Sequence, residues 1–299
     1  MTSDPIFRGG KAVLDPARAY AAVFERELGP SGALTPTAAV FITNKECPFK
    51  CVMCDLWVHT LDARIAPGLV PAQIATALES LPPARQVKLY NAGSFFDPDA
   101  IPPEDDEAIA GLVRRMDRVI VEAHPAFLAG VHGERCLRFR DRLEGALEVA
   151  IGLETAHPGV LQHLNKGMTV ETFQRAADFL GEHGIALRVF VLLRPPSMTE
   201  DEGVEWACRS IDLAAACGAT ACSVIPTRGG EQPRVSSLER VIEYGIAVRD
   251  ASSGMRVFAD LWDIERFFDC ACSPHRAERL RVMNRTQRVE APVECRCAA

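Results

Sequence analysis

The chain has 299 residues, a formal net charge of −7 at pH 7, and 48% hydrophobic and 24% charged residues. This ordinary globular composition excludes a collagen-like, coiled-coil or broadly disordered chain, and the acidic balance argues against binding nucleic acid by bulk positive charge. No uncharged apolar stretch reaches the ~18 residues of a membrane span. The first residues lack the basic and apolar regions of a secretory signal, so we expect a cytoplasmic location and no membrane partner.

The chain opens with a segment that predicts a helix, with Asp15 as N-cap, Pro16 at the first helical position and an end near Leu28. Apolar runs then alternate with helical patterns. The runs that predict strands are Thr37–Thr43, Gln86–Tyr90, Arg118–Ala123, Ala146–Leu153, Ile185–Leu193 and Ala219–Ile225. The helices predicted after them are Pro71–Leu81, Pro103–Met116, Glu134–Glu144, Val170–His183, Glu200–Cys217 and Ser236–Ala251.

This alternation predicts an α/β fold, a partial (β/α)6 TIM-type barrel with a cysteine-containing C-terminal extension. Nearly uninterrupted apolar runs are typical of parallel strands buried on both faces, which right-handed crossovers connect. We therefore expect an N-terminal helical appendage (residues 1–35), a partial barrel (36–230) and the extension (231–299), with a turn-rich boundary at Pro226–Pro233. Chemistry in such barrels lies at the C-terminal ends of the strands.

Three cysteines follow the first predicted strand with the spacing C-x3-C-x2-C: Cys47, Cys51 and Cys54. Eleven cysteines without a secretory signal favour metal ligation or reduced thiols over disulfides. Thiolate ligands are typical of zinc sites and of iron–sulfur clusters. A zinc site needs a fourth ligand, for which His59 is the near candidate, whereas three ligands suit a 4Fe–4S cluster with one open iron. Three unrelated thiols are the remaining alternative.

With this motif the chain resembles the radical S-adenosylmethionine (radical SAM) superfamily over residues 37–230. The family signature has the same spacing and an apolar or aromatic residue before the last cysteine, a position that Met53 fills, while Phe49 adds a second apolar side chain. The resemblance implies that the three cysteines hold a 4Fe–4S cluster whose open iron binds S-adenosylmethionine. One electron then cleaves the cofactor to a 5′-deoxyadenosyl radical, which takes hydrogen from a substrate.

Further positions match the places where this superfamily contacts its cofactor. Asn91, Gly93 and Ser94 follow the second strand, where a glycine-containing motif contacts the methionyl amine, although the family's usual glutamate is absent here. Glu154 ends the fourth strand at the place of a ribose contact, and Lys166 matches a cation for the cofactor carboxylate. The alternatives are an ordinary glycine turn, an ion pair between Glu154 and an arginine, and a solvated lysine.

Two arginines and two short motifs complete the resemblance. Arg188 on the fifth strand and Arg194 at its end are placed for an anion, and Arg188, in an apolar run, needs a partner if it is buried. The segment His163–Gly167 is similar to the branch that contains the Elongator catalytic subunit, which is the stronger likeness overall. The motifs Asn91–Pro98 and Leu164–Thr169 resemble the radical SAM subunit of archaeosine synthase, which acts on tRNA.

The C-terminal extension carries two C-x-C pairs: Cys270 with Cys272, and Cys295 with Cys297. Four thiolates predict a second, auxiliary 4Fe–4S cluster, and a four-cysteine zinc site or unrelated thiols are the alternatives. Such a cluster could hold substrate, relay an electron or donate sulfur.

Three functions remain open at this point. The first is a radical enzyme acting on a small molecule, with a reductant such as flavodoxin or ferredoxin; no catalytic residue can be assigned. The second is an enzyme that modifies tRNA or a nucleoside, for which five C-terminal arginines could form a patch unless they pair with acids: Arg276, Arg279, Arg281, Arg285 and Arg288. The third is a metal- or cluster-binding protein without catalysis.

Overall fold

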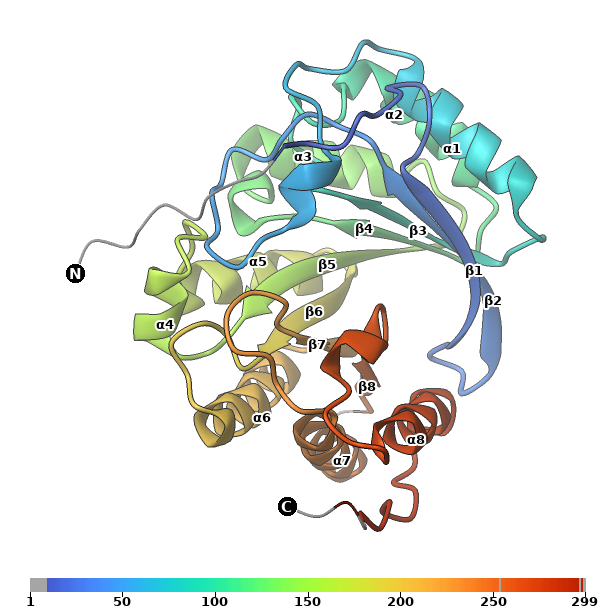
Figure 1. Cartoon of the computed structure of the whole chain (residues 1–299). Helices are drawn as coiled ribbons and strands as arrows, with labels where there is room; N and C mark the ends of the chain where they lie inside the picture. Colours follow the sequence, from blue (N-terminus) through green and yellow to red (C-terminus); the bar gives the residue numbers. More distant parts are fainter. Residues whose placement is uncertain (1–9, 253, 296, 298–299) are drawn as a thin grey trace.

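The computed structural model describes residues 10–252, 254–295 and 297. Eight strands form one curled sheet in the order β1 to β8, and Figure 1 shows the helices on its outer side. β1 is antiparallel to β2, and each later pair of neighbours is parallel. The strands are β1 Ala21–Leu28, β2 Leu34–Ile42, β3 Gln86–Asn91, β4 Arg118–Glu122, β5 Ala146–Glu154, β6 Ala186–Leu193, β7 Ala221–Pro226 and β8 Arg256–Ala259.

The connections between parallel strands are mostly helical. The α-helices are α1 Leu69–Ser80, α2 Asp106–Val113, α3 Gly130–Arg140, α4 Pro158–His163, α5 Val170–Glu182, α6 Glu200–Ala216, α7 Val235–Ser252 and α8 Ser273–Thr286. Short 3-10 helices are η1 Leu56–His59, η2 Pro103–Asp105, η3 Pro125–Phe127 and η4 Ile264–Phe267. None of the described helices is long and apolar enough to cross a membrane.

The predicted partial barrel is confirmed, because each of the six expected strands overlaps one of β2 to β7. Successive side chains of each strand point to opposite faces of the sheet, one toward the helices and one into the barrel. Leu147, Val149 and Ile151 of β5 join the apolar core beneath the helices, whereas Glu148 between them points into the barrel. The sheet also continues past residue 230, since β8 pairs in parallel with β7.

The helix expected from Asp15 to Leu28 is wrong, because this segment contains β1. β1 pairs with β2 in a register that runs from Ala21 opposite Phe41 to Leu28 opposite Leu34. Its alternate residues Glu25 and Glu27 both form ion pairs with Lys88. The sheet hydrogen bonds and these pairs outweigh local helix propensity. Residues 1–9 of the expected appendage lie outside the described residues.

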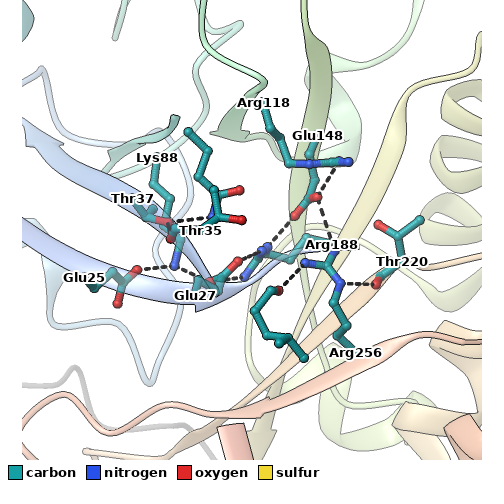
Figure 2. Close-up of polar contacts among 12 residues, drawn as sticks. Glu25, Glu27, Thr35, Thr37, Lys88, Arg118, Glu148, Arg188, Thr220 and Arg256 are labelled. Atoms are coloured by element: carbon teal, nitrogen blue, oxygen red, sulfur yellow. Dashed lines mark hydrogen bonds and ion pairs between the residues drawn. The ribbon is translucent and has the colours of Figure 1, made fainter. Parts of the chain in front are cut away.

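An ion-pair network closes the N-terminal end of the barrel, and Figure 2 shows how it joins strands that are distant in the sheet. Arg188 of β6 donates to both carboxylate oxygens of Glu27 on β1, at 2.6 and 3.1 Å, and to Glu148 of β5 at 2.6 Å. Lys88 of β3 lies 2.5 Å from Glu25 and Glu27. Since β1 and β6 are not neighbours, these bonds cross the interior of the curled sheet.

Candidate functional site

The cysteine loop (residues 43–68) begins at the C-terminal end of β2 and leads to α1. Two hydrogen bonds attach it to the segment after α4. The N–H of Val52 donates to the carbonyl of Leu164 at 3.0 Å, and the amide of Asn165 donates to the carbonyl of Lys50 at 3.0 Å. The loop is therefore held over the strand ends, where the sequence predicted the chemistry.

The three thiols of this loop share one environment. Cys47, Cys51 and Cys54 are half-buried. Burial raises the pKa of each thiol, to about 12 for Cys51, and the Lys166 ammonium acts in the opposite direction on all three. The charges of Cys47 and Cys54 raise the pKa of Cys51 further, so the three thiols influence one another's ionisation. Such thiols become thiolates when a cation binds them.

Glycines allow the cysteine loop to approach the strand ends closely. Gly93 has φ +138°, and a Cβ there would lie 3.4 Å from Cys47 Cβ and 3.6 Å from its Sγ. Gly167 has φ +72° and lies against the ring of Phe49, where a Cβ would be 2.9 Å from a ring carbon. Phe49 also stacks on His124, with ring centroids 3.9 Å apart. Gly93 and Phe49 thus support the loop directly.

Glu154 and Lys166, both predicted as cofactor contacts, form an ion pair beside the thiols. Burial lowers the pKa of Lys166, but the Glu154 charge and hydrogen bond outweigh it, so the pKa is raised and the ammonium stays charged. Glu154 has a left-handed φ of 66°, and a Cβ at Gly152 would collide with both charged groups. The alternatives of a solvated lysine and a Glu154–arginine pair are therefore wrong.

His124, which the sequence analysis missed, positions Lys166. Its Nδ1 accepts from the N–H of Ala126 at 3.1 Å, so Nε2 carries the proton and donates to the carbonyl of Lys166 at 3.0 Å. Burial, and then the Lys166 charge, lower the pKa of His124 to about 4, which keeps the ring neutral. Ser94 Oγ accepts from the N–H of His124 at 3.4 Å. The sequence feature that could have identified His124 is its position directly after a predicted strand.

Asn91, at the end of β3, is 2% exposed and carries an amide whose oxygen and nitrogen both lack a hydrogen-bond partner among the described residues. A buried, unpaired amide costs about 1–3 kcal/mol, and native structures rarely retain one without a reason. Ala92 follows it and accepts a hydrogen bond from Asn44 of the cysteine loop at 3.2 Å. The position and the missing partners fit a polar ligand at this strand end.

Aromatic side chains line the barrel below the thiols. Tyr90 of β3 and Phe190 of β6 meet edge to face with centroids 6.0 Å apart, although these strands are not neighbours, so both rings point inward. Phe41 lies 6.0 Å from Tyr90 and 5.6 Å from Trp262. Glu122 ends β4, and burial raises its pKa to about 8, while the Lys166 charge acts in the opposite direction. The sequence analysis missed these residues, since no local pattern distinguishes them from core positions.

The other predicted positions lie elsewhere. Met53 is half-buried in the cysteine loop, with its Cα near Gly229 of the loop after β7. The prediction that Arg188 contacts an anion at the site is wrong. Its guanidinium donates to Glu27 and Glu148 at the opposite end of the barrel. Its burial required such partners.

Arg194 and His59 are also engaged in contacts of their own. Arg194 donates to the carbonyls of Met198 and Gln232 and pairs with Glu200, so it fastens the loop after β7 instead of facing an anion. The ring of His59, the fourth ligand that a zinc site in the cysteine loop would need, stacks on Tyr20 with centroids 4.9 Å apart.

The C-terminal cysteines come together as the sequence predicted. The four sulfur atoms all lie within 4.8 Å of one another: Cys270, Cys272, Cys295 and Cys297. Among the five arginines beside them, Arg276 and Arg279 pair with Glu239, and Arg281 pairs with Glu278. These three arginines are therefore paired with acidic residues, which was the alternative to a basic patch for tRNA.

Comparisons with known proteins agree with this geometry, although no family model matches the chain. The chain is 28% identical over 195 residues to archaeosine synthase subunit beta of Methanosarcina acetivorans, covering 62% of this chain and 56% of that protein. It is 32% identical over 130 residues to the protein of the same name from Thermococcus kodakarensis, covering 42% and 39%. The chain thus spans little more than half of the first of these relatives.

Among solved structures, the archaeal Elp3 of Methanocaldococcus infernus shares the fold, with a TM-score of 0.52 and 13% identity over 74% of this chain and 61% of that one. This neighbour shows the fold, and the sequence relatives agree with the resemblance to the radical SAM superfamily that the cysteine spacing carries.

Proposed function

We propose that the chain binds a 4Fe–4S cluster through Cys47, Cys51 and Cys54 and uses S-adenosylmethionine to remove a hydrogen atom from a small molecule inside the barrel. The observation that carries this proposal is that two hydrogen bonds hold the cysteine loop against the segment that supplies Lys166, which forms an ion pair with Glu154. When bound and reduced, the cluster supplies the electron that cleaves the cofactor to a 5′-deoxyadenosyl radical. A flavodoxin or ferredoxin is the expected reductant.

The residues present fit this group. Three sulfur donors without a fourth protein ligand suit a cluster that keeps one iron open, and His59 is engaged elsewhere.

Lys166 and Glu154 would orient the cofactor. An ammonium has three N–H donors, and Glu154 accepts from one, so the others are available to a carboxylate. Glu154 retains lone pairs for ribose hydroxyls or an amine. His124 fixes the backbone of Lys166, and the unpaired amide of Asn91 supplies a further donor and acceptor. These groups are held before the cofactor binds, which lowers the entropic cost of binding.

The barrel interior supplies a place for the substrate. Tyr90 and Phe190 are partly exposed there, and Glu122 adds a carboxyl group near Lys166. Because the network around Arg188 closes the opposite end, a substrate would enter from the end that carries the cysteine loop. The proposed radical would form at this entrance, above the aromatic layer.

A tRNA or nucleoside substrate is the second candidate, and the similarity to archaeosine synthase beta subunits favours it. Phosphate contacts would make binding fall steeply with salt, whereas a small substrate would bind with little salt dependence. Binding of unmodified tRNA, measured at several salt concentrations, distinguishes the two.

The proposed cleavage is tested with anaerobically reconstituted protein, dithionite and S-adenosylmethionine. We expect 5′-deoxyadenosine from the wild type and from Cys217→Ser, a half-buried thiol outside the site that serves as control. Cys51→Ala should lower the yield at least about 100-fold, because the cluster loses a ligand. Equal production by Cys51→Ala would contradict the assignment. No production by cluster-loaded wild type would favour the non-catalytic alternative.

A further inference from the structure

The four C-terminal thiols form a site separate from the cysteine loop. Cys270 and Cys272 directly precede α8, and Cys295 and Cys297 lie in the segment that follows it. In Figure 1 this segment lies beside α7 and α8, away from the loop after β2. All four sulfur atoms lie within 4.8 Å of one another, and the Sγ atoms of Cys272 and Cys297 are 3.7 Å apart.

These separations distinguish one metal ion from a cluster. Four thiolates at ~2.3 Å from a tetrahedral zinc ion lie ~3.8 Å from each other, the edge of that tetrahedron. A 4Fe–4S cube places its four cysteine sulfurs ~6 Å apart, because each binds a different iron corner of the cube from the outside. The limit of 4.8 Å is compatible with the first arrangement and too short for the second.

We propose that Cys270, Cys272, Cys295 and Cys297 bind a single zinc ion in a closed, structural site, in place of the auxiliary iron–sulfur cluster that the sequence suggested. Four protein ligands leave no open position for substrate, so the site has no part in the radical reaction. This inference does not rest on the proposed function, since it concerns different residues.

The surroundings of the sulfur atoms suit a negatively charged tetrathiolate. Ser273 Oγ lies 3.7 Å from the sulfur of Cys270. Four thiolates with Zn²⁺ carry a net charge of about −2, which the N-terminal end of α8, a helix of 14 residues, also stabilises.

The ion would connect the end of the chain to the last strand of the sheet. Arg279 of α8 donates to the carbonyl of Glu290 at 2.5 Å, in the segment that leads to the second C-x-C pair. At the other end of α8, Gln287 bonds to both the N–H and the carbonyl of Val257 in β8, each at 2.7 Å. Metal bound at the start of α8 would therefore stabilise the packing of this helix against β8.

Metal analysis of two variants tests the proposal. The triple variant Cys47→Ala/Cys51→Ala/Cys54→Ala removes the proposed cluster site, and Cys270→Ser/Cys295→Ser removes the proposed zinc site. After anaerobic reconstitution with iron and sulfide, we expect about one zinc and no cluster iron in the triple variant. About four irons per chain in the triple variant, with the absorption of an iron–sulfur cluster, would overturn the proposal.

A measurement on the unaltered chain keeps the test decisive if Cys270→Ser/Cys295→Ser does not fold. Wild-type protein produced with cobalt in place of zinc should show the intense visible bands of tetrahedral tetrathiolate cobalt, at one ion per chain. The control Cys208→Ser/Cys217→Ser should retain these bands. Wild-type protein that holds neither zinc nor cobalt after gel filtration would refute the site, whether or not it cleaves S-adenosylmethionine.

Discussion

Replacing Arg188 by methionine should destabilise the protein strongly without affecting cofactor binding. Arg188 is 1% exposed and makes three hydrogen bonds of 2.6 to 3.1 Å to Glu27 and Glu148. Methionine preserves much of the volume but leaves two buried carboxylates with less compensation. Removing one partner of a buried ion pair costs about 3–5 kcal/mol, a large part of the about 5–15 kcal/mol by which domains are stable.

Urea unfolding followed by circular dichroism measures this loss, with Arg209→Met as the matched control. Arg209 pairs with Glu205 at 2.6 Å and lies 4.6 Å from the Trp206 ring centroid, but the charged side chains are 54% exposed, so that variant should change stability by at most about 1 kcal/mol. Glu27→Gln/Glu148→Gln/Arg188→Met should recover part of the loss, because it removes the uncompensated charges.

The pH dependence of the free energy of unfolding tests the same ion pairs, and the direction of the change follows from the pKa of Glu27. Burial alone would raise the pKa of Glu27, but Arg188 and Lys88 outweigh it and hold the pKa well below its usual value. A carboxyl with a lowered folded pKa contributes stability above its unfolded pKa, and that contribution disappears as the pH falls. The wild type should therefore lose stability below about pH 4.3, and Arg188→Met should show a weaker loss.

This explanation is wrong if Arg188→Met has the same urea midpoint of unfolding as the wild type. It also fails if the variant keeps its stability and binds S-adenosylmethionine at least tenfold more weakly. The second result would return Arg188 to the role of an anion ligand that the sequence suggested.

Two more predictions concern the cofactor end of the barrel. Lys166→Met should raise the KM for S-adenosylmethionine about 10- to 100-fold in a 5′-deoxyadenosine assay, because a charge-assisted hydrogen bond contributes about 1.5–3 kcal/mol. An unchanged KM would exclude this lysine as the ligand of the cofactor carboxylate. Gly152→Ala should raise the same KM by displacing the Lys166–Glu154 pair, with Gly181→Ala, in open space on α5, as the control; equal KM values would contradict that packing.

The sequence determined the features that depend on near neighbours. The spacing of Cys47, Cys51 and Cys54 puts three sulfur atoms on one short loop in any fold, and apolar runs identified the six central strands because parallel strands are buried on both faces. Placing the chemistry after a strand also indicated Glu154, whereas Lys166 was indicated by the resemblance of its segment to a known family.

Tertiary structure alone decided the features that depend on distant partners. Arg188 looked suited to an anion, but its carboxylate Glu27 stands 161 residues away on a strand whose local sequence favoured a helix. The C-x-C pairs predicted convergence, yet spacing along the chain says nothing about the distance between sulfurs that approach from different segments. That distance, set by the packing of the final segment against α8, separates a single ion from a cluster.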